Sequence, residues 1–164
     1  MRLVCRVLRR AYARNPFDGE GAYRYGGRWS SPGIRLAYTS EHQSLAMLEY
    51  FVHLDKDDPP SDLVLAVAEI PEDVTRQSLD FAEVPVNWRA GSAPPELTRF
   101  GDEFVSAATS CVLSVPSVLA PHENNCLINP AHREFRRIVV RQLEPLNYDE
   151  RMLEKRPHRA AKKS

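Results

Sequence analysis

An almost uninterrupted apolar run at residues 63–70 (LVLAVAEI) constrains the fold of this chain more than any other feature. Prolines bound the run on both sides, with Pro59 and Pro60 before it and Pro71 directly after it. A short apolar run between such boundaries is typical of a strand buried inside the protein. The sequence therefore predicts a buried strand over residues 63–70 that ends at Pro71.

Other short strands and two helices are predicted around this run. The strands are expected at residues 2–8, 34–39, 111–115 and 135–141. One helix begins with a capping box at Ser40–Gln43 and runs to about Leu54, and a second spans residues 101–110. Residues 71–100 are irregular and carry prolines. Short strands with few helices and no βαβ rhythm predict an α+β fold around a split or curved sheet, and 164 residues fit one compact domain.

The glycines are concentrated in one segment of the chain. Residues 15–33 hold five of the seven glycines and two prolines, which predicts a long ordered loop or a set of tight turns. Within it, Gly26 and Gly27 allow the backbone to approach a ligand closely, and the Arg28 guanidinium suits a phosphate or a carboxylate. Because Gly-Gly-Arg also occurs in ordinary turns, this motif alone leaves both interpretations open.

The predicted helix at residues 41–54 places one carboxylate in an unusual position. At about 100° per residue, Glu49 lies about 40° around the helix from Leu45 and is also flanked by Val52, at the edge of the apolar stripe. A carboxylate there is partly desolvated unless a cation or a hydroxyl group meets it. Glu49 is therefore either a candidate catalytic group or a rim glutamate whose side chain reaches solvent.

Two further polar residues lie in or next to predicted strands. Arg6 stands among apolar residues, so it either meets an anion or a carbonyl group or points to water from an edge strand. Ser117 follows a strand end and Pro116, where its hydroxyl is well exposed for hydrogen bonding. The GxSxG context of a hydrolase nucleophile is missing around this serine.

No metal site, disulfide framework or membrane segment is expected. His122, Cys126 and His132 share no compact metal-ligand spacing, so metal binding is not predicted. Cys5, Cys111 and Cys126 form an odd set without a CxxC pair, which favours reduced thiols and a cytoplasmic protein. No stretch approaches the about 20 apolar residues that span a bilayer.

The charge of the chain is balanced in total but unevenly distributed. It has 22 Lys and Arg against 22 Asp and Glu, which argues against bulk nucleic-acid binding because such domains are normally strongly basic. Residues 151–164 carry six Lys or Arg and one Glu, so residues 1–150 are acidic, with 16 basic and 21 acidic side chains. The segment 151–164 is expected to be a flexible basic tail, with contact to a partner or nucleic acid as the alternative.

Five short motifs occur together in the order typical of a known family. They are GEGAYRYGGRWSSPG at 19–33, AYTSEHQSLAMLEYFVHL at 37–54, NWR at 87–89, GDEF at 101–104 and VLSVPSVLAPHENNCLINPAHREF at 112–135. In these motifs the chain resembles the RES domain, named for its arginine, glutamate and serine. The resemblance covers roughly residues 3–150, so residues 1–150 are assigned to the domain and 151–164 to the tail. One departure is Phe104, where a tryptophan is expected.

The resemblance implies a fold and a function. The fold would be similar to that of ADP-ribosyltransferase toxins, with a dinucleotide cleft in a split sheet. The protein would be the toxin of a type II toxin–antitoxin pair and would degrade NAD+ by phosphorolysis or hydrolysis of the nicotinamide–ribose bond. NAD+ would be its substrate, with no resident cofactor. An Xre-type helix-turn-helix antitoxin would cover the active site, and DNA would be contacted only through that antitoxin.

The resemblance also assigns site residues one by one. The family arginines fall on Arg6 and Arg28, the glutamate on Glu49, the serine on Ser117 and an active-site tyrosine on Tyr38. Glu49 would stabilise the positive charge that develops on the ribose, and the arginines would bind the pyrophosphate. Tyr38 would stack on nicotinamide or ribose, and Ser117 would hydrogen-bond the carboxamide or a ribose oxygen.

Two alternatives to NAD+ degradation stay open at this point. The same cleft could pass ADP-ribose to a cellular protein, which would make the chain an ADP-ribosyltransferase. Alternatively, the chain could be a non-catalytic binding module that uses the basic tail at residues 151–164.

Overall fold

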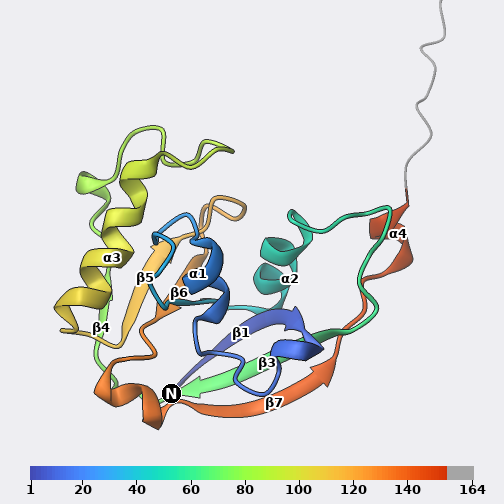
Figure 1. Ribbon diagram of the computed structural model, residues 1–164, viewed down its shortest axis with the longest axis horizontal. Helices are drawn as coiled ribbons and strands as arrows, with labels where there is room; N and C mark the ends of the chain where they lie inside the picture. The colour runs from blue at the N-terminus through green and yellow to red at the C-terminus, as the bar shows by residue number, and fades with distance from the viewer. Residues whose placement is uncertain (155–164) are drawn as a thin grey trace, which may run out of the picture.

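The architecture is a seven-stranded mixed sheet flanked by short helices (Figure 1), in a computed structural model that describes residues 1–154. The strands are β1 (Arg2–Arg9), β2 (Ala37–Ser40), β3 (Leu63–Ile70), β4 (Arg76–Ser78), β5 (Val112–Pro116), β6 (Asn124–Ile128) and β7 (Val139–Pro145). Their order in the sheet is β4-β5-β6-β2-β1-β3-β7. The pairing is antiparallel except between β4 and β5.

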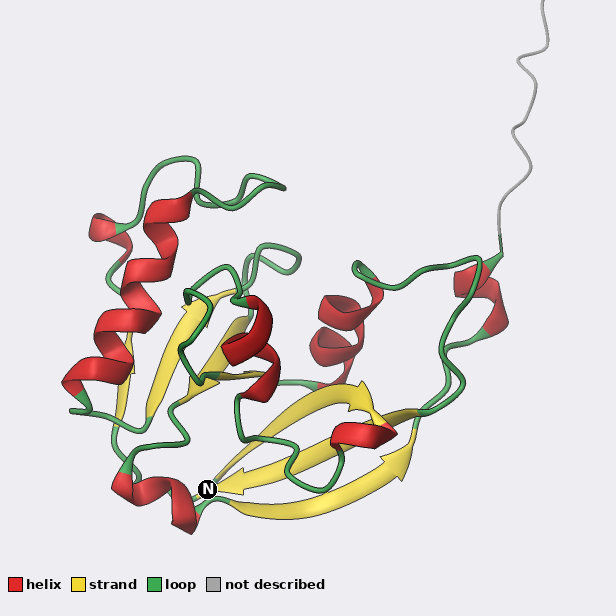
Figure 2. Ribbon diagram, viewed as in Figure 1, coloured by secondary structure: helices red, strands yellow, loops and turns green. Residues whose placement is uncertain are grey.

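Within residues 1–154, four α-helices and four short 3₁₀ segments accompany these strands. The α-helices are α1 (Glu20–Tyr25), α2 (Gln43–Phe51), α3 (Thr98–Ala107) and α4 (Glu150–Leu153), and the 3₁₀ segments are η1 (Arg10–Tyr12), η2 (Phe81–Glu83), η3 (Pro95–Leu97) and η4 (Arg133–Arg137). Figure 2 shows α3 beside the β4–β5–β6 part of the sheet, whereas α2 lies over β1. Residues from these elements form three buried apolar clusters rather than one.

The sheet is split at its centre. β1 pairs with β3 along its whole length, from Arg2 to Arg9, but it joins β2 through the single residue pair Cys5 and Ser40. Beyond that pair the two strands diverge, and the halves β4-β5-β6-β2 and β1-β3-β7 separate (Figure 2). This arrangement confirms the predicted α+β fold with a split sheet.

The predicted elements are confirmed best where the sequence is most apolar. The strand at Leu63–Ile70 is found at the predicted bounds and is buried along almost all of its length. The predicted helix 101–110 is α3, displaced toward the N-terminus by three residues. The predicted strand 135–141 is β7, which begins only at Val139 because η4 occupies the preceding residues, with Phe135 packed against the core.

Three predictions from local sequence signals were wrong or incomplete. The capping box does not form, because Ser40 belongs to β2 and its hydroxyl donates to Asn125 Oδ1 at 2.7 Å instead of capping α2. The glycine-rich segment, predicted to be a loop or a set of turns, contains the helix α1, which no periodic apolar pattern indicated. The region 71–100, predicted to be irregular, contains β4. The strand β6 was not predicted, because it begins with polar residues.

Three further predictions concerned the cysteines, membrane-spanning segments and the basic tail. Cys5, Cys111 and Cys126 are free and buried, and burial raises the pKa of Cys126 to about 11. Within residues 1–154, no helix is long and apolar enough to cross a membrane. Of the predicted basic tail, residues 151–153 belong to α4, and residues 155–164 lie outside the described part of the chain.

Gly101 fixes the distance between α3 and the turn that carries Trp29. Its backbone N–H donates to Trp29 O at 2.9 Å, and an added Cβ would overlap that same carbonyl oxygen. Phe104, one turn further along α3, is buried in the same cluster as Trp29.

Gly101→Ala is expected to destabilise the fold even though alanine favours helices. The helix propensity gain is at most about 1 kcal/mol, whereas overpacking against backbone costs about 1–3 kcal/mol. The melting temperature should therefore fall by a few degrees, measured by circular dichroism. Gly91→Ala is the matched control, because an added Cβ at Gly91 has no neighbour within 4 Å. Equal melting temperatures for Gly101→Ala and wild type would contradict the close approach described here.

Candidate functional site

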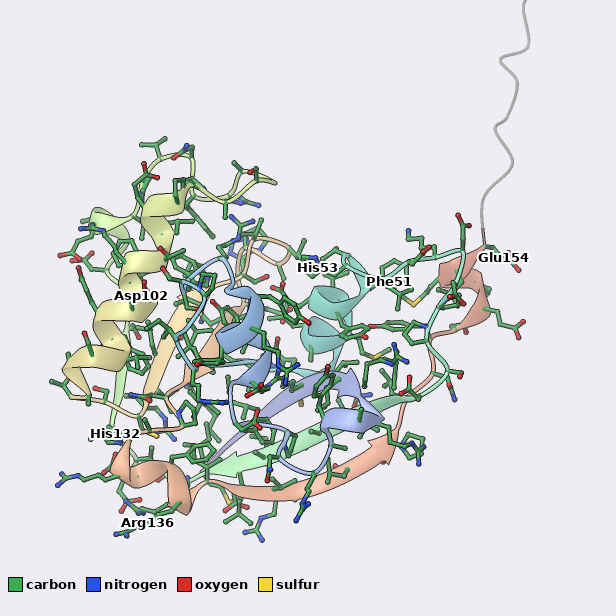
Figure 3. All side chains as sticks on the ribbon, viewed as in Figure 1. Phe51, His53, Asp102, His132, Arg136 and Glu154 are labelled. Carbon is green, nitrogen blue, oxygen red and sulfur yellow. The ribbon has the colours of Figure 1, made fainter. Side chains whose placement is uncertain are left out.

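A cavity lined by residues of β1, β2, α2 and β6 opens where β1 and β2 diverge. Its volume is about 510 Å³, within the range of small-molecule sites. Four polar side chains in its walls come from four different elements: Arg6 on β1, Tyr38 on β2, Glu49 on α2 and Asn125 on β6. His53 also lines it, and Figure 3 shows this residue just beyond the C-terminal end of α2. The split in the sheet thus creates the candidate site.

Glu49 is held by two hydrogen bonds at one of its carboxylate oxygens. Its Oε1 accepts from Ser117 Oγ at 2.8 Å and from Asn125 Nδ2 at 2.6 Å. The residue is half-buried beside the buried Leu45, but Val52, which was predicted to flank it on the apolar stripe, is 50% exposed and lies just beyond α2. Both donors bind Oε1, so the carboxylate is held in one orientation, and Oε2 has no hydrogen-bond partner within residues 1–154.

Ser117 lies behind Glu49 rather than in the cavity wall. The prediction of a well-exposed hydroxyl was wrong, because Ser117 is fully buried and its Oγ accepts from the backbone N–H groups of Leu119 at 3.0 Å and Ala120 at 3.1 Å. A hydroxyl has one proton and two acceptor sites, so all three are used once the proton is donated to Glu49. The structure therefore supports Ser117 as a residue that orients the carboxylate. Direct contact of this hydroxyl with a substrate stays a prediction.

Asn125 is a site residue that the sequence patterns did not reveal. It lies directly across from Ser40 in the β2–β6 ladder, and its Oδ1 accepts from Ser40 Oγ while its Nδ2 donates to Glu49. The available signal was weak: a polar residue at the start of a strand, in a segment that reads as a loop. Ser40, Asn125, Glu49 and Ser117 form one continuous hydrogen-bonded chain.

Tyr38 contributes a ring whose hydroxyl is enclosed by the glycine-rich turn. The hydroxyl accepts from Trp29 N at 3.0 Å and shares a hydrogen bond of 3.0 Å with Ser30 Oγ. Burial raises the pKa of Tyr38, so the hydroxyl stays protonated at neutral pH. A Cβ on Gly27 would lie 2.5 Å from that hydroxyl oxygen, which explains the need for glycine in this turn.

Arg6 brings a partly buried positive charge to the cavity. Its Nη1 donates to Pro16 O at 2.7 Å, and burial lowers the pKa of the guanidinium, with Asp18 opposing that effect. One neutral carbonyl group satisfies only part of a guanidinium, which has five N–H donors. Arg6 is thus the predicted anion ligand that the structure places in the cavity wall.

Arg28 has a different environment from the one its predicted role requires. It is absent from the cavity walls, and its Nη1 and Nη2 donate to Trp88 O at 2.7 Å and Ala90 O at 3.0 Å. Burial lowers the pKa of Arg28, with Glu49 and Tyr38 opposing that effect, so its charge still acts on the site. Pyrophosphate binding by Arg28 stays a prediction, since its guanidinium holds main-chain carbonyl groups here.

Arg28 therefore holds the segment 85–91, named the strap, beside the site through these two hydrogen bonds. The Trp88 ring lies 6.3 Å from the Trp29 ring, and Arg89 Nη2 donates to Val118 O at 3.3 Å, next to Ser117. These contacts connect the glycine-rich turn, the strap and the loop that orients Glu49.

Arg28→Lys is expected to loosen the strap while the positive charge is kept. One ammonium group cannot reproduce the two parallel bonds of a guanidinium, and a lost hydrogen bond is worth about 1 kcal/mol, or about a fivefold change in opening. Amide hydrogen exchange at residues 85–91 should accelerate by about that factor. Arg99→Lys is the control, because Arg99 is exposed on α3. Unchanged exchange in Arg28→Lys would show that other contacts hold the strap.

The residues considered for metal binding are placed in structural roles. Within residues 1–154, no group of three or more His, Cys, Asp or Glu side chains could hold a metal ion. His132 is buried, and its Nδ1 accepts from Glu134 N at the start of η4. Cys126 is fully buried in β6.

Comparisons with known proteins agree with the resemblance seen in the motifs. The family model described as "RES domain" matches residues 3–149. A protein named "Toxin Res" from Yersinia enterocolitica is 36% identical over 146 residues, covering 89% of this chain and 95% of the relative. A "Prs ADP-ribosylating toxin" from a Sphingobium species is 34% identical over 148 residues, covering 89% and 92%. The fold is similar to a crystal structure of the M. tuberculosis MbcT–MbcA toxin–antitoxin complex, with a TM-score of 0.72, 16% identity and coverage of 88% and 84%.

Proposed function

Because this chain belongs to the RES domain family of toxins, we propose that it acts by cleaving the bond between nicotinamide and ribose in NAD+. The observation that carries this proposal is the fixed carboxylate of Glu49, whose Oε1 is held by Ser117 and Asn125 beside a cavity of about 510 Å³. A preorientated negative charge in a partly desolvated site suits a reaction that develops positive charge.

The proposed chemistry needs an electrostatic group more than a proton donor. The C1′–N bond breaks with its electron pair moving to the pyridinium nitrogen, so nicotinamide leaves as a neutral molecule without being protonated. The ribose carbon becomes oxocarbenium-like, and Glu49 Oε2 would stabilise that charge directly or through the ribose hydroxyl groups. An oxygen of phosphate or of water then forms the new bond to C1′, and water releases a proton in that step.

Other residues of the cavity bind and orient NAD+ in this proposal. Tyr38 offers its ring to the nicotinamide or the ribose, since its hydroxyl is already engaged by the Trp29–Ser30 turn. Arg6 binds the pyrophosphate, because its partly buried charge lines the cavity and its hydrogen bond within residues 1–154 goes to the neutral carbonyl group of Pro16. Arg28 supports the charge distribution of the site and would reach a phosphate only by releasing the strap.

Transfer of ADP-ribose to a protein is the second candidate function. It is supported by the Sphingobium relative, whose name describes an ADP-ribosylating toxin. The bond that breaks is the same, and only the acceptor differs. The third possibility, a non-catalytic module that uses the tail 151–164, draws on residues that lie mostly outside the described chain.

An antitoxin is the partner that this proposal includes. The structure with a similar fold is a toxin–antitoxin complex, which supports a cognate antitoxin for this chain as well. An Xre-type helix-turn-helix protein that covers the cavity, with DNA contacted only through it, and a cytoplasmic location remain predictions from the family resemblance.

Product identification from NAD+ tests the proposal. The purified chain, freed of any bound antitoxin, is incubated with NAD+ with and without phosphate, and the products are separated by chromatography. Release of nicotinamide is expected, together with ADP-ribose phosphorylated at that same C1′ carbon when phosphate is present, or with ADP-ribose when it is absent. Label from NAD+ on a protein of a cell extract would favour transfer instead. Intact NAD+ under all these conditions would refute both enzymatic functions.

A further inference from the structure

Two exposed tyrosine side chains line the cavity. Tyr12 in η1 is 51% exposed and Tyr25 at the end of α1 is 78% exposed, yet both belong to the cavity wall. Neither ring has an aromatic or cation–π contact within the described residues. Large rings in a cavity wall without such contacts are available to a ligand.

The topology places these tyrosines on the two diverging sides of the site. β1 and β2 meet at the Cys5–Ser40 pair, which lies beside the Asn125 and Glu49 end of the cavity. From there β1 leads away to Arg9 and then directly into η1 with Tyr12. On the other side, the Gly26–Gly27 turn that follows Tyr25 encloses the hydroxyl of Tyr38 on β2.

Arg24 interacts electrostatically with both tyrosines. Arg24 lines the cavity, and its pKa is raised first by its hydrogen bond to Glu20, then by the charge of Glu20, and last by weak Coulombic interactions with Tyr12 and Tyr25. Both hydroxyl groups therefore lie within electrostatic reach of the same guanidinium. Because that guanidinium already pairs with Glu20 at 2.6 Å, the mouth of the cavity is aromatic rather than strongly cationic.

We propose that Tyr12 and Tyr25 form a stacking subsite for the purine base at the distal end of a dinucleotide whose ribose lies at Glu49. This inference rests on the proposed function. A planar base is the chemistry that suits the subsite, since bases stack on aromatic side chains and need no charge from the protein. With the diphosphate at Arg6, between Glu49 and the mouth, the base is the part of the ligand that reaches the two rings.

Tyr23 provides a matched control on the same helix. It is 44% exposed, as large as its neighbours, and absent from the cavity wall, and its ring lies 4.6 Å from the guanidinium carbon of Arg35. Replacing it removes an exposed tyrosine from α1 without changing the cavity.

The test uses ADP and inorganic pyrophosphate as probes, with binding measured by isothermal titration calorimetry on the full chain. Tyr12→Ala and Tyr25→Ala should each weaken ADP binding at least about fivefold and leave pyrophosphate binding unchanged. Tyr12→Phe and Tyr25→Phe should bind ADP like wild type, because the ring is kept. Tyr23→Ala should also match wild type.

Kinetics of NAD+ cleavage give an independent readout. Both alanine variants should raise KM for NAD+ by about the same factor and keep kcat, because the rings are remote from the bond that breaks. Unchanged ADP binding in both alanine variants, or an equal loss in Tyr23→Ala, overturns the subsite. Loss of antitoxin binding with unchanged ADP affinity also overturns it, in favour of a protein-docking surface.

Failure of the subsite can be told apart from failure of the proposed function. If wild type binds ADP through the tyrosines but does not cleave NAD+, the subsite stands and the reaction is wrong. If NAD+ is cleaved and ADP binding is independent of both rings, the reaction stands and the subsite is wrong.

Discussion

Glu49→Gln should reduce kcat for nicotinamide release from NAD+ by at least about 10²- to 10³-fold, with little change in KM. Glutamine keeps the size of the side chain and an oxygen that can accept from Ser117 and Asn125, so the local hydrogen bonds can persist. Only the negative charge is removed. The loss should therefore appear in the step in which the ribose becomes positive, measured by initial rates of nicotinamide release at saturating NAD+.

Glu103→Gln is the control for this substitution. Glu103 is an exposed glutamate of α3 and takes no part in the cavity wall, so its variant should keep wild-type rates and melting temperature. Glu49→Gln should melt like wild type as well. A folded Glu49→Gln protein with wild-type kcat would remove Glu49 from the reaction and with it the observation that carries the proposed function.

Asn125→Ala should lower kcat for the same reaction by about 10- to 100-fold while the protein stays folded. The Nδ2 group of Asn125 donates the shorter of the two hydrogen bonds to Glu49 Oε1, at 2.6 Å. Its Oδ1 accepts a hydrogen bond from the Ser40 hydroxyl. Without it the carboxylate retains its charge but loses a fixed direction, and misplacement of about 1 Å is enough for losses of this size. Ser117→Ala should act in the same direction, since it removes the other donor.

The double variant and a neighbouring asparagine make this prediction specific. Because Asn125 and Ser117 hold the same oxygen, the combined loss in the double variant should be smaller than the product of the single losses. Asn124→Ala, one residue earlier on β6, is the control and should retain activity. A rise in KM with unchanged kcat for Asn125→Ala would show that Asn125 binds substrate instead of orienting Glu49.

Local sequence patterns predicted the elements that consist mostly of apolar residues and the positions that depend on residues nearby in the sequence. The strand at Leu63–Ile70 could be placed because seven of its eight residues are apolar and prolines bound the run. Glu49 could be singled out because a helical projection places it relative to Leu45 and Val52. α1 and β6 escaped, since glycines in one and asparagines in the other favour a loop when only neighbours are considered.

The remaining features of the site depend on contacts between distant parts of the chain. Asn125 reaches Glu49 across 76 positions, and Arg28 reaches Trp88 across 60. In the second case the acceptor is a main-chain carbonyl group, which every residue possesses and no side-chain pattern can report. For the same reason the family motif could identify Arg28 as important without giving its partner.

The single Cys5–Ser40 pair between the two half-sheets has a mechanical consequence. A ligand that touches Arg6 on one half and Tyr38 on the other would connect the two half-sheets in addition to that strand pair. Bound nucleotide should then restrict the motion of the two half-sheets relative to one another. Without nucleotide, the half-sheets should rotate relative to one another about the Cys5–Ser40 pair.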